Sequence, residues 1–174
     1  MQQETALNLL KSGKNVFLTG SAGTGKTYVL NQYIQYLKER KIPVAITAST
    51  GIAATHMNGQ TIHSWCGMGV KDNIHQVDLR KLSEKKYIQK NVQNAKVLII
   101  DEISMLSSQT FSMVEAVCRE VRANDRPFGG LQVLLVGDFF QLPPISRRDS
   151  ETPEEDMFGQ GSSQTQFAFT SPAW

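Results

Sequence analysis

Short apolar runs alternate along the chain with longer segments in which apolar residues recur every three or four positions. The short runs predict buried strands at 16–19, at 44–47, within 96–106 and at 131–136. The helical spacing predicts helices at 2–12, 26–42, 49–57 and 110–123. Strands and helices in alternation predict one α/β domain whose mostly parallel sheet is covered by helices on both faces.

The segment after the first predicted strand fits the phosphate-binding pattern G-x-x-x-x-G-K-[ST] at every position. Its glycines let backbone N–H groups converge on phosphate oxygens, and the helix that starts near Lys26 presents its positive end to the same anion. Lys26 is expected to neutralise phosphate charge, and the Thr27 hydroxyl to bind Mg²⁺. A glycine-rich turn that binds nothing is the alternative. The predicted nucleotide-binding residues of this loop are Gly20, Ser21, Ala22, Gly23, Thr24, Gly25, Lys26 and Thr27.

Two adjacent carboxylates, Asp101 and Glu102, end the most apolar of the predicted strands. Ligands of parallel sheets bind at the carboxyl ends of the strands. Asp101 is expected to hold Mg²⁺ directly or through water, and Glu102 to orient and polarise an attacking water. Acids that end a strand also commonly cap the next helix, which is the alternative.

Gln141 follows the fourth predicted strand, at the same end of the sheet as the acids. A neutral amide there can donate a hydrogen bond to a γ-phosphate oxygen and sense its loss. A surface glutamine ahead of a rigid Pro-Pro turn explains the position equally well, so the spacing leaves both interpretations open.

Two further helix starts are candidates for contacts with nucleic acid. Thr50 and Gly51 open the third predicted helix, and Thr61 opens a short segment that contains His63 and Trp65. Exposed N–H groups at such starts bind nucleic-acid phosphates as readily as nucleotide phosphates. Ordinary capping with a core-facing Trp65 explains the same residues, and the pattern alone favours it.

Composition sets limits rather than a function. A chain of 174 residues with 40% apolar and 20% charged residues is typical of one globular domain. Cys66 and Cys118 lack C-x-x-C spacing, which indicates buried free thiols in a reducing compartment. No apolar run reaches membrane-spanning length and no signal segment is evident, so we expect an intracellular protein without a membrane partner.

Positive charge lies ahead of a polar tail. All 18 Lys and Arg lie at or before Arg148, against 11 acids there, an excess that suits a polyanion and is also common on solvated surfaces. The polar stretch 71–96 is expected to be a solvated face rather than a DNA-binding surface. We expect a lobe at 1–146, a flexible acidic and polar loop at 147–166, and a final strand or connecting segment at 167–174.

Five segments then occur in a characteristic order: TGSAGTGKT from Thr19, TASTGIAA from Thr47, TIHSW from Thr61, LIIDEISML from Leu98 and VGDFFQLPPI from Val136. Together they resemble the motor of the Pif-type helicases, 5′-to-3′ DNA helicases of superfamily 1. The segment 114–132 is similar to a signature that separates this family from the RecD branch. The resemblance implies a RecA-like lobe of three α/β/α layers with a mostly parallel sheet.

The resemblance also implies a role for each matching residue. Gln3 would contact adenine, Thr27 and Asp101 would bind the metal, and Gln141 would be the γ-phosphate sensor. The implied catalytic residues are Lys26, Glu102 and Gln141. The residues implied to touch single-stranded DNA, largely through backbone and phosphate, are Thr50, Gly51, Ile52 and His63.

The motor of this family has two RecA-like lobes, and this sequence ends before a second one. We therefore expect the N-terminal motor lobe of an ATP-dependent DNA helicase, a monomer that uses ATP and Mg²⁺ and cannot step along DNA without the second lobe. The expected location is the bacterial cytoplasm near the nucleoid, or the nucleus or mitochondrion of a eukaryote. The expected processes are DNA repair, recombination and telomere maintenance.

Two rival functions remain at this stage. The first is a P-loop ATPase or nucleotide kinase that acts without DNA. A kinase should carry a mobile Arg-rich lid, and Arg147-Arg148 is weak evidence for one. The second is an inactive scaffold that holds nucleotide or DNA. The presence of all five expected functional groups argues against an inactive scaffold, which would not require them: Lys26, Thr27, Asp101, Glu102 and Gln141.

Overall fold

A single parallel sheet forms the centre of the protein. The computed structural model describes residues 2–68, 79–140 and 167–174. Within them, five strands pair in the order β1-β5-β4-β2-β3, and every pair is parallel. The strands are β1 (Val16–Thr19), β2 (Val44–Ala48), β3 (Gln60–Thr61), β4 (Val97–Asp101) and β5 (Gln132–Gly137). The prediction of a mostly parallel sheet is confirmed.

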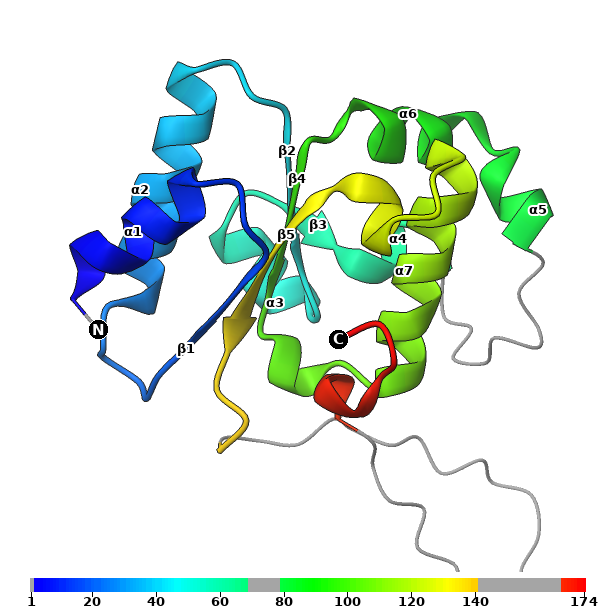
Figure 1. Ribbon diagram of the computed structural model, residues 1–174. Helices are drawn as coiled ribbons and strands as arrows, with labels where there is room; N and C mark the ends of the chain where they lie inside the picture. Colours follow the sequence, from blue (N-terminus) through cyan, green and yellow to red (C-terminus); the bar gives the residue numbers. More distant parts are fainter. Residues whose placement is uncertain (1, 69–78, 141–166) are drawn as a thin grey trace, which may run out of the picture.

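Helices cover both faces of this sheet, which Figure 1 shows nearly edge-on between two helical layers. One layer contains α1 (Gln3–Lys11) and α2 (Lys26–Glu39). The other contains α4 (Ile62–Trp65), α5 (Leu79–Ser83), α6 (Lys86–Asn94) and α7 (Ser108–Arg122), while α3 (Gly51–His56) lies between β2 and β3 in the chain. The expected three-layer α/β/α architecture is confirmed. No helix in the described part of the chain is long and apolar enough to cross a membrane.

The apolar run of β4 is continuous because both of its faces are buried. Val97 and Ile99 pack with α1 and α2, whereas Leu98 and Ile100 pack with α6 and α7. At most 3% of each of these side chains is exposed. The run therefore places the carboxyl end of β4, where the acids lie, in the middle of a rigid sheet.

One expectation for the middle of the chain is wrong. The stretch 71–96 is not simply a solvated face, because its described part forms α5 and α6 and buries Leu82, Ile88 and Val92 in the core. The residues ahead of α5 lie outside the described part. The sequence also gives no sign of β3, which extends the sheet by two residues.

The C-terminal residues pack beside α7. Phe167 makes one antiparallel bridge with Ser107, and the 3₁₀ helix η4 (Ala168–Thr170) follows it. Of the final strand or connecting segment expected at 167–174, the structure shows one bridge residue followed by a 3₁₀ helix, and the role of this segment stays a prediction. The loop expected at 147–166 lies outside the described residues.

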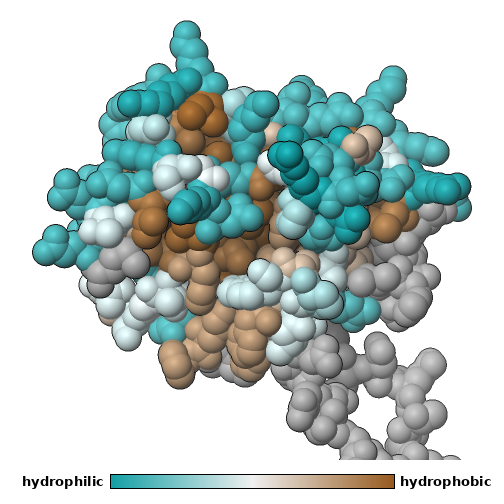
Figure 2. Space-filling model, viewed as in Figure 1, coloured by the Kyte–Doolittle hydropathy of each residue, from teal (hydrophilic) through white to brown (hydrophobic). Residues whose placement is uncertain are grey.

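An aromatic cluster joins this C-terminal segment to the end of β5. The Phe139 ring lies 4.9 Å from the Phe169 ring, 5.8 Å from the Trp174 ring and 5.4 Å from the Phe17 ring, measured between centroids. Figure 2 shows the moderately hydrophobic surface at the lower end of the molecule, beyond the carboxyl ends of the strands. The cluster holds the chain that follows β5 close to the first strand.

Arg122 has a structural role in the segment 114–132, which resembles a family signature. Its Nε donates to the Gly129 carbonyl at 2.7 Å, and its Nη1 donates to the carbonyls of Val92 and Ala95 at 3.0 and 3.1 Å. Gly129 has a φ of 61°, and a Cβ there would lie 2.6 Å from the Cys118 carbonyl oxygen. The guanidinium thus ties the ends of α6 and α7 to the turn that leads into β5.

We expect Arg122→Ala to lower the free energy of unfolding by about 3 kcal/mol, because it leaves three part-buried carbonyls without a charged donor. Arg119→Ala is the matched control: its side chain is 44% exposed and pairs with Glu115 and Asp125 at 3.7 and 3.5 Å. Surface pairs of this kind contribute roughly 0–1 kcal/mol. Urea denaturation of the 174-residue chain measures both, and equal midpoints for the two variants would contradict this role of Arg122.

Candidate nucleotide-binding site

The phosphate-binding loop and the two acids lie at the same edge of the sheet. β5 pairs with β1 on one side and with β4 on the other, with Thr19 opposite Gly137 at the ends of β1 and β5. Neighbouring strands lie about 4.8 Å apart, so the end of β1 is about 10 Å from the end of β4. A nucleotide triphosphate with its metal ion can span such a distance. The expected convergence is therefore observed at the level of the backbone.

The loop has the backbone conformation that phosphate binding requires. Gly23 and Gly25 have φ values of 79° and 88°, which L side chains rarely adopt. Gly25 caps α2, and the loop residues Ser21 to Thr24 are exposed. The Lys26 ammonium donates to the carbonyl oxygens of Gly20 and Ser21, the latter at 3.0 Å, so it is held over the concave side of the loop. The exposed Thr27 hydroxyl stands beside it at the start of α2.

Gln3, the implied adenine contact, lies against this loop although it precedes Gly25 by 22 positions in the chain. A Cβ on Gly25 would lie 2.2 Å from the Gln3 Nε2 atom, so the lack of a side chain at Gly25 lets the Gln3 amide lie this close to the loop. The Gln3 side chain is exposed at the start of α1 and retains donors and an acceptor for a base. Its role in adenine contact stays a prediction, which its place beside the loop supports.

The acids adopt two different backbone conformations. Asp101 is the last residue of β4, and its carboxylate accepts a hydrogen bond from the Glu102 N–H at 2.9 Å. Glu102 has φ 52° and ψ 44°, a left-handed conformation that costs a residue with a Cβ about 1–2 kcal/mol. The 3₁₀ helix η2 (Ile103–Met105) follows, and the Glu102 side chain does not cap it. The alternative role of Glu102 as a side-chain helix cap is thus not observed.

Negative charge at this edge is only partly compensated. Burial raises the pKa of Glu102, the charges of Asp101 and Asp138 raise it further, and the Lys26 ammonium opposes them. Burial also raises the pKa of Asp101, against the Glu102 N–H and Lys26. These four side chains therefore share one electrostatic environment. A divalent cation would relieve the repulsion, and hydroxyl and carboxylate oxygens are the ligands that Mg²⁺ prefers.

Asp138 is a member of the site that the sequence reasoning did not single out. It follows β5 as Asp101 ends β4, and only 7% of it is exposed. Its carboxylate accepts a hydrogen bond from the Phe140 N–H at 3.0 Å. The signal available in the sequence was a second acid directly after a strand whose residues 133–136 are all apolar.

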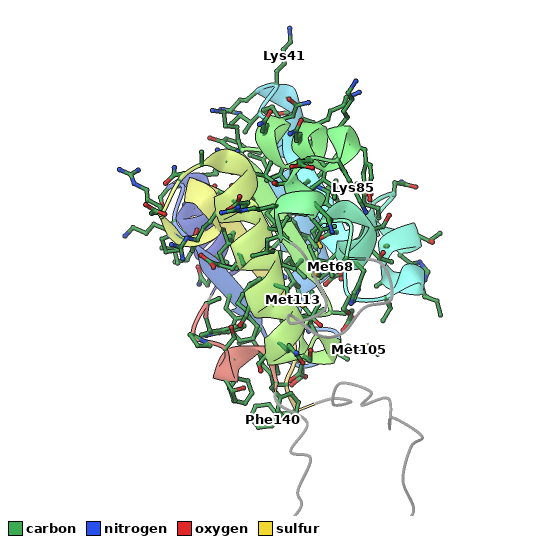
Figure 3. All side chains as sticks on the ribbon, turned by 90° about the vertical axis from the view of Figure 1, so that its right-hand side faces the viewer. Lys41, Met68, Lys85, Met105, Met113 and Phe140 are labelled. Atoms are coloured by element: carbon green, nitrogen blue, oxygen red, sulfur yellow. The ribbon has the colours of Figure 1, made fainter. Side chains whose placement is uncertain are left out.

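Gln141, the expected γ-phosphate sensor, lies outside the described residues. Phe140, the residue before it, is fully exposed at this edge of the sheet. Figure 3 shows Phe140 and Met105 of η2 toward the same end of the molecule, with Lys41 at the opposite end. The function of Gln141 stays a prediction.

The residues implied to contact DNA line the neighbouring part of the same edge. Thr50 caps α3, since its Oγ1 accepts the Ala53 N–H at 3.3 Å, and Ile52 is 77% exposed. Thr61 of β3 lies opposite Ala48 at the end of β2 and caps α4, so the half-buried His63 is close to the same edge. Gly51 is exposed at the start of α3.

The capping interpretation of these two helix starts is correct, and Trp65 is a core residue with 2% of its surface exposed. Capping does not exclude contact with DNA, because the caps are made by side chains and the exposed surface around them stays accessible. Cys66 and Cys118 are buried free thiols, as expected, and burial raises the pKa of Cys66 to about 12.

Comparison with known proteins decides the family. The model that describes PIF1-like helicases matches residues 2–164. The chain belongs to the PIF1-like helicases. It is 56% identical over 174 residues to the ATP-dependent DNA helicase Pif1 of Psychrobacter sp. (strain PRwf-1), covering 100% of this chain and 25% of that protein. It is 41% identical to the ATP-dependent DNA helicase PIF1 of Xenopus laevis, covering 99% of this chain and 25% of that protein.

Solved PIF1-like structures share the fold of this chain. The crystal structure of Pif1 helicase from Candida albicans matches with a TM-score of 0.81 and 37% identity, over 99% of this chain and 36% of that one. The Bacteroides Pif1 helicase in complex with ADP-AlF3 and ssDNA matches with a TM-score of 0.71 and 34% identity, over 84% and 33% of the two chains. The RecA-like fold is thereby established. The chain spans 25% of the length of the two curated relatives described above.

Proposed function

We propose that this chain is the first motor lobe of an ATP-dependent DNA helicase that moves 5′-to-3′ along single-stranded DNA. The observation that carries the proposal is the shared environment of Lys26, Asp101, Glu102 and Asp138 beside a phosphate-binding loop. The named activity of the curated relatives and the nucleotide and ssDNA in the Bacteroides complex support it.

Each residue of the nucleotide site has one task in this proposal. Lys26 and the loop N–H groups bind the β- and γ-phosphates of ATP, and Gln3 contacts adenine. Thr27 and Asp101 hold Mg²⁺, which supplies Lewis-acid polarisation of the phosphate oxygens. Glu102 accepts a proton from the attacking water and orients its lone pair toward the γ-phosphorus. Gln141 senses whether the γ-phosphate is present.

Single-stranded DNA is the proposed partner of α3 and the start of α4. Thr50, Gly51, Ile52 and His63 would contact it, mostly through backbone atoms and phosphate. Contacts of that kind fix position without reading sequence, which suits a motor that must pass every base. The proposed helicase works as a monomer.

A second RecA-like lobe of the same polypeptide completes the motor in this proposal. Stepping needs two lobes that grip the strand in turn as ATP is bound and hydrolysed, so one lobe cannot translocate. The protein would act in DNA repair, recombination and telomere maintenance. It would work in the bacterial cytoplasm near the nucleoid, or in the nucleus or mitochondrion of a eukaryote.

The rate of ATP hydrolysis with and without single-stranded DNA tests this proposal. We expect DNA to stimulate the full-length protein by at least roughly tenfold, the usual size of a coupling between two sites. We expect the 174-residue chain alone to bind nucleotide weakly and to unwind nothing. An unchanged rate in the full-length protein would favour a DNA-independent ATPase or kinase, and DNA-stimulated hydrolysis by the chain alone would show that the second lobe is not needed.

A further inference from the structure

Ser49 connects the proposed DNA-binding segment to the acids of the nucleotide site. Its N–H donates to the Asp101 carbonyl at 3.0 Å, and its hydroxyl donates to the Glu102 carbonyl at 2.7 Å. Ser49 follows β2 directly and precedes Thr50, the cap of α3. One half-buried residue therefore touches both acids through the backbone and starts the segment proposed to hold DNA.

The Ser49 hydroxyl reaches the Glu102 carbonyl from a different part of the chain, directly after β2. The Glu102 N–H donates to the carboxylate of Asp101, its neighbour in the chain, and its carbonyl accepts the Met105 N–H at 3.0 Å within η2. Both of these contacts move with the segment that contains Glu102. A left-handed residue with a Cβ persists only where its surroundings impose the conformation. The Ser49 hydroxyl is thus a long-range restraint on Glu102.

On the opposite side, the end of β5 blocks movement of this segment. A Cβ on Gly137 would lie 2.9 Å from Ile103 Cγ2 and 3.1 Å from Ile103 N, so the two backbones already touch. Because β5 is paired on both sides, with β1 and with β4, it resists a shift of the segment around Glu102 toward it. Packing against β5 thus limits this segment on one side, and the hydrogen bond from Ser49 holds it on the other.

We propose that Ser49 is a positioning residue that aligns the Glu102 carboxylate when single-stranded DNA binds at α3. A shift of α3 on DNA binding reaches Ser49 through two peptide bonds and reaches the Glu102 carbonyl through one hydrogen bond. This inference rests on the proposed function, since it assigns the coupling between DNA and hydrolysis to a particular side chain.

The test measures ATP hydrolysis by the full-length protein with and without an oligothymidylate. Ser49→Ala is expected to reduce the stimulation by DNA roughly tenfold. The basal rate, the KM for ATP and the affinity for the oligonucleotide are expected to stay within about twofold of the parent, because no side chain that contacts either ligand changes. Ser49→Thr keeps the hydroxyl and is expected to restore the stimulation.

Thr47→Val is the matched control. The Thr47 hydroxyl also links β2 to β4, by donating to the Ile99 carbonyl at 2.6 Å, but it does not touch the acids. We expect Thr47→Val to lower the melting temperature and to keep the stimulation by DNA. Should Ser49→Ala fail to fold, Ser49→Cys, which has the size of serine but is a weak donor, takes its place.

The inference is overturned, while the proposed function stands, if stimulation is unchanged in Ser49→Ala or if Thr47→Val shows the same loss as Ser49→Ala. Loss of basal and stimulated rates by one common factor in Ser49→Ala also overturns it, because a purely structural role gives that result. If the parent protein shows no stimulation by DNA, the proposed function itself fails.

Discussion

Replacing Lys26 by alanine is expected to abolish ATP hydrolysis and to weaken nucleotide binding about 100-fold. The Lys26 ammonium is held over the loop by the carbonyls of Gly20 and Ser21, in the position where phosphate oxygens would replace them as acceptors. Hydrogen bonds from a charged donor contribute about 1.5–3 kcal/mol, and about 3 kcal/mol corresponds to a factor of about 100 in affinity. Binding of a fluorescent ATP analogue by the full-length protein measures the change.

Lys38→Ala provides the control for this experiment. Lys38 lies on the same helix, α2, but in its last turn, at the opposite edge of the sheet, and its side chain is exposed. The Lys38→Ala substitution removes the same charge from the protein without touching the loop. Nucleotide affinity should stay within about twofold of the parent, because exposed charges at this distance are screened by salt. If Lys26→Ala kept parental affinity, the loop would not be a nucleotide site.

The parts of the site that the sequence predicted are those set by contiguous residues. The loop from Gly20 to Thr27 needs positive φ values at fixed positions, so its pattern can be read without knowing the fold. The strand that ends at Asp101 can be recognised in the sequence because burial on both faces requires a continuous apolar run. Once the strands are known to be parallel, their carboxyl ends must share one edge.

The parts that the sequence could not predict depend on contacts between distant segments. Ser49 and Glu102 are 53 positions apart, and nothing in either neighbourhood indicates their hydrogen bond. The left-handed conformation of Glu102 is likewise imposed by packing rather than by residue type. Arg122 is a similar case: a cation at a helix end usually faces solvent, yet its guanidinium binds three carbonyls from two other segments.

The error at 71–96 has a different physical origin. Ile88 and Val92 are spaced by four and lie on one side of α6, so the helical pattern was present in the sequence. The surrounding lysines and amides suggested a solvated face. A helix that covers a sheet needs only a narrow apolar stripe, and the two fully buried side chains provide it.

Replacing Glu102 by glutamine is expected to reduce kcat for ATP hydrolysis by about 10³-fold while nucleotide still binds. The amide keeps the size of the side chain and one acceptor oxygen but cannot take a proton from water, and general bases contribute about 10²–10⁴ in rate. The KM for ATP should change little, because phosphate binding rests on Lys26 and the loop. Parental turnover in Glu102→Gln would support the inactive-scaffold alternative.

The same substitution should make the nucleotide-free protein more stable, which separates lost chemistry from lost folding. The folded-state pKa of Glu102 is raised above its ordinary 4.5 by burial and by Asp101. Below pH 4.5 the carboxyl is protonated in both the folded and the unfolded protein. As pH rises from there through the folded-state pKa, the free energy of unfolding falls, because the unfolded protein ionises freely whereas the folded protein must bear a buried charge. The melting temperature of Glu102→Gln should therefore exceed that of the parent at pH 8, with the difference vanishing toward pH 4. Glu39→Gln, at an exposed position on α2, should show no such difference at either pH. A Glu102→Gln protein that is both inactive and less stable at pH 8 would show that the carboxylate is a structural requirement rather than a strained catalytic group.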